Sequence, residues 1–403
     1  MFELDAIQTL ALAGACLMVG YGLCRHVSIL SRYNIPAPVV GGLLLALASL
    51  VAHGRGQTLF ALDTSLQTPL MIAFFTAIGA NASVSLLRIS GRQVAIFLAL
   101  AAGFTVVQNL AGVMVAKLFG LHPLFGVLAG STTMAGGPAT GLAFAPLFEQ
   151  AGVQGAQSVA ITAAMAGIIC GGLLGGPLAT ALIRRWGIRT PDHGDPELAA
   201  QLNDPGYQQA NGQSHSQREF TALKSIVLLL IAMWLGSWIS QGISQLGITL
   251  PSYIGAMLVG AAMRNLDDRT GWLKLSMPTI EVIGNVCLSM FLALALMNLK
   301  LWELAGLALP LVAILIVQAT LVGLFAFIVV YRLMGRDYDA AVMGGGFVGF
   351  MLGTTANAMA VMRTLVERYG MAPRAFLVAP LVGAFFIDFA NALVITGFLN
   401  FWK

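Results

Sequence analysis

Long runs without a charged residue recur along this chain and limit what it can fold into. A helix needs about 20 apolar residues to cross the hydrocarbon core of a bilayer. The first half has runs of about that length at Ala6–Cys24, Tyr33–Ala52, Thr64–Leu87, Gln93–Ala116 and within Gln150–Ile183. The second half has them at Ser225–Met263, Val282–Leu299 and Leu304–Tyr331, and in a last run, Ala375–Trp402, Asp388 is the one charged residue. Pro251 interrupts Ser225–Met263, which therefore predicts two spans joined near Gly247. The pattern predicts an all-α polytopic membrane protein with two sets of five spans.

Composition excludes several other classes of protein. Only 9% of the residues are charged and 58% are hydrophobic, whereas a soluble domain has about 25% charged residues. A soluble enzyme, a disordered chain and a nucleic-acid binder are thereby excluded. The four cysteines lie in apolar runs without a metal-ligand spacing, so no transition metal and no cofactor is expected. We find no phosphate-binding loop and no Ser/His/Asp triad, so neither an ATP-driven pump nor a membrane enzyme is favoured.

Two further apolar segments are rich in glycine and predict interrupted helices. Five glycines and Pro138 lie between positions 126 and 141, and another five glycines lie between 344 and 353. Glycine at this density destabilises a continuous helix, and irregular backbone at membrane depth needs surrounding protein or an aqueous cavity. We therefore expect re-entrant hairpins at about 122–148 and 338–363. A spanning helix packed through small residues is the alternative for each.

The two halves of the chain repeat the same order of parts. Pro36 and Pro251 are 215 positions apart, and Glu149-Gln-Ala-Gly152 matches Glu367-Arg-Tyr-Gly370 at an offset of 218. We expect an N-terminal repeat at 1–185, a polar linker at 186–220 and a C-terminal repeat at 221–403. Because five spans is an odd number, the second repeat is predicted to be inverted, as in secondary transporters.

The basic residues predict how the spans are oriented. With the N-terminus outside, 17 of the 21 Lys and Arg residues fall on the inner side and 4 on the outer side. Positive residues accumulate in cytoplasmic loops. The linker is therefore expected in the cytoplasm, and both termini are expected outside.

The last span contains the candidate cation ligands. Asp388 lies near the middle of Ala375–Trp402, and Asn391 follows three positions later on the same helical face. A carboxylate at this depth is costly and usually functional, and with an amide oxygen it suits Na⁺. A proton carrier and a structural aspartate are the alternatives. For Gln318 and Asn285 the sequence favours hydrogen bonds between helices, and both are also candidate sodium ligands.

The hairpin tips supply the candidate solute ligands. No Lys or Arg lies deep in a span, so an anionic solute would depend on helix N-termini, amides and hydroxyls. Two tips entering from opposite sides are expected to meet near the midplane. The candidate solute-binding residues are Ser131, Thr132, Thr133, Gly136, Gly137, Thr140, Gly141, Gly353, Thr354, Thr355 and Asn357.

Several stretches together resemble the bacterial sodium/glutamate symporter family over nearly the whole chain. They are Ile35–Gly42, Pro69–Phe75, Gly284–Leu296, Lys300–Ala305, Tyr338–Val342, Val382–Asp388 and Asn391–Ile395. The resemblance implies uptake of L-glutamate driven by Na⁺, inverted five-span domains with re-entrant loops and a bacterial inner-membrane location. It also implies a homodimer with elevator-like motion.

The tips depart from the family pattern at Pro138, Ala139, Met351 and Ala356. The first of these departures lies where familiar members resemble Ser-Gly-Gly-His-Gly-Thr-Gly. Another organic anion, such as a di- or hydroxycarboxylate, is therefore the alternative solute. A channel or a membrane sensor that does not transport is the alternative from a different class.

Overall fold

The computed structural model describes residues 2–33, 35–57, 60–85, 91–190, 215–247, 249–304 and 306–402. Its helices in the first half are α1 (Ala6–His26), α2 (Ser28–Arg32), α3 (Ala37–His53), α4 (Gln67–Ala80), α6 (Gly91–Leu118), α7 (Pro123–Val127), the π-helical turn η1 (Leu128–Thr132), α8 (Gly137–Gln150) and α9 (Ala156–Arg185). A short parallel pair of strands, β1 (Phe2–Leu4) and β2 (Phe60–Leu62), joins the N-terminus to the loop before α4. The charge-free runs did not predict this pair.

The second half continues with α11 (His215–Gln245), α12 (Tyr253–Thr270), α13 (Met277–Met297), the 3₁₀ turn η2 (Leu301–Leu304), α14 (Ala308–Phe325), the π-helical turn η3 (Ala326–Val330) and α15 (Tyr331–Leu333). It ends with α16 (Tyr338–Met351), α17 (Thr355–Tyr369), α18 (Pro373–Leu381), the π-helical turn η4 (Val382–Phe386) and α19 (Ile387–Phe401). Apart from the strand pair the described chain is helical, so the expected fold class is confirmed at this level.

Six described helical segments are long and apolar enough to cross a membrane: Ala6–His26, Gly91–Leu118, Ala156–Arg185, Glu219–Gln245, Met277–Met297 and Ala308–Leu333. Four shorter apolar segments accompany them: Ala37–His53, Gln67–Ala80, Pro123–Thr132 and Ile387–Phe401. The chain is therefore a multi-pass membrane protein. The predicted break in Ser225–Met263 is confirmed, because α11 ends at Gln245 and α12 begins at Tyr253.

Some boundaries differ from those expected. The third span is shorter than predicted, because α4 ends at Ala80 and Asn81 is its C-cap. The expected linker at 186–220 is partly helical, since α11 begins at His215 and no Pro or Gly follows until Gly236. Residues 191–214 of that linker lie outside the described residues.

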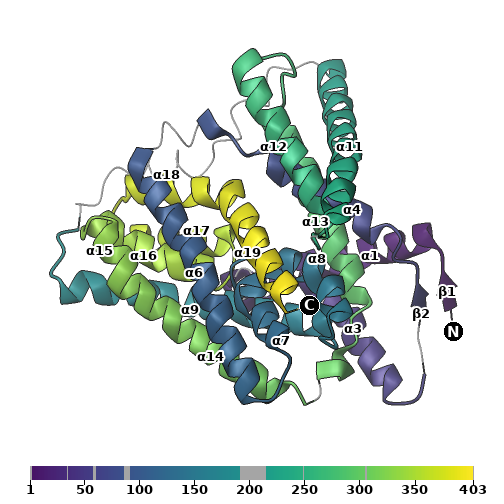
Figure 1. The fold of residues 1–403 in the computed structure, drawn as a ribbon, viewed down its shortest axis with the longest axis horizontal. Coiled ribbons are helices and arrows are strands. Elements are labelled where there is room, and N and C mark those ends of the chain that lie inside the picture. Colours follow the sequence, from purple (N-terminus) through teal and green to yellow (C-terminus); the bar gives the residue numbers. More distant parts are fainter. Residues whose placement is uncertain are drawn as a thin grey trace.

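The helices pack into two bundles, and each bundle takes helices from both halves of the chain. The peripheral bundle consists of α1, α3, α4, α11, α12 and α13; α11 and α12 lie side by side at one end of it (Figure 1). The hairpin bundle consists of α6 to α9 and α14 to α19. This arrangement brings the two glycine-rich segments together in one bundle.

Each glycine-rich segment forms a helix, a short break and a second helix. In the first hairpin, η1 ends at Thr132 and α8 begins at Gly137; in the second, α16 ends at Met351 and α17 begins at Thr355. The expected helical interruptions are confirmed, whereas the side from which each hairpin enters the membrane stays a prediction.

The second hairpin is the centre of the core. Helix α16 is buried along nearly its whole length, as expected for a helix that is apolar on every face. The Phe347 ring lies 5.7 Å from each of the rings of Phe97, Phe104 and Phe325, which belong to α6 and α14. Because these rings surround α16, the position of the second tip is set by close packing.

Candidate functional site

The first tip consists of residues 130–137, from the last turn of η1 to the start of α8. Gly130 leaves the helical region, with φ −94° and ψ −130°, and so opens the helix before the tip. Ser131, Thr132 and Thr133 are fully buried. The Thr133 hydroxyl donates to the Leu128 carbonyl at 2.8 Å, which leaves it no proton to offer a solute.

The second tip is capped by its own threonine. The Thr354 hydroxyl accepts from the Asn357 amide at 3.4 Å, at the N-terminus of α17. The Thr355 hydroxyl donates to the Gly383 carbonyl at 3.2 Å and so ties this tip to η4. Two of the hydroxyls expected to donate to a solute are therefore already donating to carbonyls.

The two tips are in contact with each other. Gly137 has φ +65°, and a Cβ placed on it would lie 2.9 Å from Thr354 Cγ2 and 3.6 Å from the Gly353 carbonyl oxygen. Only glycine adopts this backbone conformation without strain while allowing so close an approach. The N-termini of α8 and α17, which belong to different halves of the chain, therefore lie next to each other.

Adjacent residues of α6 hold the two tips. The Asn109 Oδ1 atom accepts from the Ser131 amide of the first tip at 2.9 Å. Gln108 Nε2 donates to the Met351 carbonyl of the second tip at 2.8 Å. Gln318 of α14 donates from Nε2 to the Gln108 carbonyl at 2.7 Å, so the hydrogen bond between helices expected for Gln318 is present.

One of the two candidate cation residues of α19, Asn391, contacts the first tip. Asn391 Nδ2 donates to the Ser131 carbonyl at 3.0 Å. Asp388 lies in the first turn of α19, directly after the π-helical turn η4. Within the described part of the chain its carboxylate makes no hydrogen bond or ion pair.

The turn η4, which directly precedes Asp388, contacts α4 of the peripheral bundle, so Asp388 lies near the junction of the two bundles. Tyr253 of α12 also lies at this junction. The Tyr253 ring stacks on Phe75 of α4 at 3.8 Å and lies edge-on to Phe144 of α8 at 6.2 Å. It therefore contacts the peripheral bundle and the first hairpin at once. Tyr253 is not among the residues predicted from the sequence; a polar aromatic residue at the start of a span is the signal that could have identified it.

Asn357 connects the second tip to α9. Its Nδ2 donates to the Ile168 carbonyl at 3.1 Å and to the Gly349 carbonyl at 3.2 Å. A Cβ on Gly171 of α9 would lie 2.7 Å from the same nitrogen. Because Gly171 has no side chain, α9 can approach the second tip this closely.

Buried oxygens without a partner accumulate on these residues. Among the described residues, the side-chain atoms at or beside the tips with no hydrogen-bond partner include Gln108 Oε1, Ser131 Oγ, Thr132 Oγ1, Gln318 Oε1, Asn357 Oδ1 and Asn391 Oδ1. An unpaired buried polar atom is costly. Oxygen ligands of this type suit a hard cation, so the set fits Na⁺.

The remaining residues singled out from the sequence differ in burial and in their distance from the tips. Thr140 and Gly141 are buried in the first turns of α8, where a Cβ on Gly141 would lie 3.0 Å from Thr133 Cγ2. Of the positions that depart from the family pattern, Pro138 and Met351 are buried, Ala139 is half-buried and Ala356 is exposed. Asn285 is exposed on α13, in the peripheral bundle.

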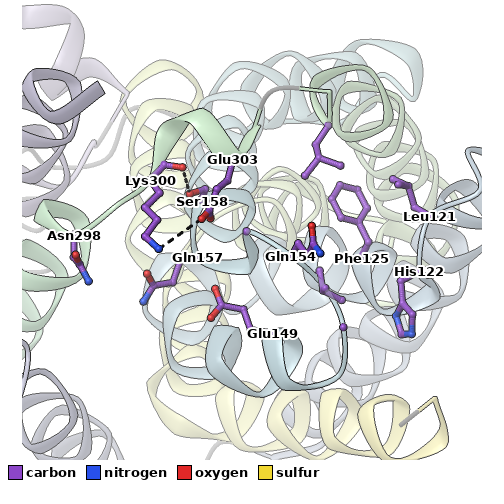
Figure 2. Close-up of a pocket in the computed structure, with 14 residues that line it drawn as sticks. Leu121, His122, Phe125, Glu149, Gln154, Gln157, Ser158, Asn298, Lys300 and Glu303 are labelled. Carbon is purple, nitrogen blue, oxygen red and sulfur yellow. Dashed lines mark hydrogen bonds and ion pairs between the residues drawn. The ribbon is translucent and has the colours of Figure 1, made fainter. Parts of the chain in front are cut away.

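A separate polar cavity of 870 Å³ lies at the base of the first hairpin, away from its tip (Figure 2). The Ser158 hydroxyl donates to the Lys300 carbonyl at 3.0 Å, and Lys300 Nζ lies 3.8 Å from Glu303 Oε1. The polar lining that Figure 2 labels also includes His122, Glu149, Gln154, Gln157 and Asn298. This cavity lies between η2 and the connection from α8 to α9.

Two broken helices meet inside this multi-pass helical protein, and unpaired buried oxygens lie beside them. This arrangement is typical of secondary transporters. A model of the sodium/glutamate symporter family matches residues 2–371. The chain is 43% identical over 400 residues to the sodium/glutamate symporter of Escherichia coli strain K12, covering 99% of this chain and 98% of the relative. It is 37% identical over 398 residues to the Haemophilus influenzae protein of the same name, covering 98% and 97%. The chain belongs to the sodium/glutamate symporter family, and it is not an enzyme.

Proposed function

We propose that this protein is a Na⁺-coupled symporter that imports L-glutamate, or a closely similar acidic solute, across the bacterial inner membrane. Family membership supports the coupling and the solute class. The observation that carries the proposal in this chain is the contact between the tips at Gly137 and Thr354. It brings two helix N-termini to one point, and helix N-termini attract carboxylates.

The solute carboxylates bind backbone N–H groups at the starts of α8 and α17. The hydroxyls of Thr133 and Thr355 orient the tips, because both already donate to carbonyls. Each helix N-terminus contributes roughly half a positive charge, and bound Na⁺ contributes a full one. These charges together compensate an anion without a basic side chain.

Na⁺ binds beside the tips through Asp388, Asn391 and Gln318. Asp388 and Asn391 lie one helical turn apart on α19, and Asn391 also holds the first tip. Binding of Na⁺ at these oxygens therefore acts on the geometry of the first tip. Asn285, exposed on the other bundle, lies outside this set of ligands in the proposal.

The proposed transport cycle uses the two bundles. Each contains helices from residues 1–185 and from residues 221–403, which supports two inverted repeats. The hairpin bundle carries the solute past the peripheral bundle in an elevator-type motion, and two copies of the chain form a homodimer.

Uptake into proteoliposomes tests the function. With Na⁺ outside, labelled L-glutamate should accumulate above its equilibrium level, and replacing Na⁺ by K⁺ should abolish this accumulation. Unlabelled L-glutamate inside should exchange with labelled solute, which separates a carrier from a sensor. The departures at Pro138 and Ala139 favour testing malate and citrate in parallel. Na⁺-dependent uptake of one of these without uptake of glutamate would contradict the proposed solute.

Orientation is tested by labelling position 214, which lies outside the described residues. The 17:4 distribution of basic residues supports a cytoplasmic position for the linker. In a variant lacking the native cysteines, Ser214→Cys should resist an impermeant maleimide in intact cells and react after permeabilisation. Reaction in intact cells would overturn the inverted-repeat orientation.

A further inference from the structure

A second cavity, of 630 Å³, lies where α9 ends and α15 leads into α16, and no residue of the two tips lines it. Its lining includes Arg189, Arg332 and Arg336 together with the aromatic residues Trp186, Tyr331 and Tyr338. Three guanidinium groups around one cavity make it strongly cationic. The transport mechanism proposed above makes no use of it.

The one acidic residue of this lining is already compensated. Asp337 pairs with Arg374, which lies outside the cavity, and its carboxylate also caps α16 by accepting from the Ala340 amide at 2.9 Å. Among the described residues, Arg189, Arg332 and Arg336 form no ion pair. Their charges are therefore available to an anion that enters the cavity.

The turn that bears Arg336 is fixed from both sides. The Arg336 amide donates to the Tyr331 carbonyl at 3.1 Å, and the Tyr331 hydroxyl donates to the Arg336 carbonyl at 3.0 Å. Tyr331 is buried, and its ring stacks on Trp186 with 6.3 Å between the ring centroids. Arg336 is thus presented to the cavity from a rigid support, which lowers the entropy lost when it binds.

The surroundings of the cavity favour an amphiphile over a free ion. Trp186 is 54% exposed, and tryptophan and tyrosine are enriched where a membrane protein meets the headgroup region. Leu324, Ile328 and Leu333, on the continuous segment from α14 to α15, are also exposed. Apolar surface for acyl chains therefore continues from the arginines along one spanning segment.

We propose that this cavity binds the phosphodiester headgroup of an anionic phospholipid. Guanidinium groups match phosphate oxygens in pairs, and basic pockets between helix ends on the cytoplasmic side suit anionic lipids. The bound lipid would tie the end of α9 to the turn before the second hairpin, from Gly335 to Asp337.

Lipid retention tests the proposal with the full-length protein. The protein would be purified from vesicles of phosphatidylcholine with phosphatidylglycerol, and bound lipid counted by native mass spectrometry. We expect wild type to retain phosphatidylglycerol selectively and the Arg332→Gln/Arg336→Gln variant to bind it about 25-fold more weakly, which is about fivefold for each arginine. The charge-matched control is Arg269→Gln/Arg363→Gln, which removes exposed arginines outside the cavity and should bind as wild type does.

A competition experiment and a single-arginine variant distinguish a lipid from a soluble phosphate. Millimolar glycerol 3-phosphate should not displace the lipid; displacement would assign the cavity to a soluble phosphate and overturn the proposal. Equal retention by the two double variants would also overturn it. If the cavity variant does not fold, Arg189→Gln alone should show the fivefold loss, and retention equal to wild type would again contradict the proposal.

Discussion

Replacing Gly137 by alanine should reduce the affinity for L-glutamate by about tenfold or more. The added Cβ would lie 2.9 Å from Thr354 Cγ2, closer than such atoms approach in real structures, so the Thr354 side chain or one of the tips has to shift. Small displacements of groups that position a ligand have large effects on binding and rate. Calorimetric titration with glutamate in saturating Na⁺ measures the change.

Gly120→Ala is the matched control for this experiment. Gly120 has φ +69°, close to the +65° of Gly137, but a Cβ there would have no neighbour within 4 Å. Both substitutions therefore impose the same backbone strain, and only Gly137→Ala disturbs the contact between the tips. If the two variants lose affinity equally, strain alone explains the loss, and the tips are not the solute site.

The replacement Asp388→Asn should raise the Na⁺ concentration needed for half-maximal uptake by about tenfold, which corresponds to about 1.4 kcal/mol. Asparagine keeps the size and one oxygen but removes the negative charge. The Asp388 carboxylate has no ion-pair partner in the described chain, so its removal breaks no salt bridge and leaves the fold intact. Uptake at several Na⁺ concentrations in proteoliposomes gives the shift.

Glu281→Gln is the control for Asp388→Asn, because it also removes one negative charge but does so away from the proposed Na⁺ site. Glu281 is exposed on α13, in the peripheral bundle, and should be replaceable without a change in Na⁺ dependence. Unchanged Na⁺ dependence in Asp388→Asn would make Asp388 structural and would leave the cation site to the unpaired oxygens of Gln108 and Gln318.

The hairpins could be predicted from the sequence because glycine and proline act locally. Gly130 and Gly137 break the first helix through their own backbone angles, and these residues are visible in the chain. The π-helical turn inside the last span could not be predicted in the same way. Val382–Phe386 is an ordinary apolar run, and its π-helical turn is a small change in hydrogen bonding that composition does not specify.

The residues that hold the tips were harder to recognise. Asn109 bonds to Ser131, 22 positions away, and Gln108 bonds to Met351, 243 positions away. A buried amide in an apolar helix looks the same in the sequence whatever its partner is. Asn391 could be selected only because Asp388 lies one turn before it, whereas Asn109 has no such neighbour. Pairings across the two halves need the fold.

Gln108 and Asn109 are joined by one peptide bond, yet each holds a different hairpin. Swinging one hairpin aside as an independent gate would break one of these hydrogen bonds and leave a buried group unpaired, at a cost of about 1–3 kcal/mol. Moving both hairpins together with α6 breaks neither. We therefore expect the contact between the tips to keep its geometry during transport, and the helices around the tips to control access to them.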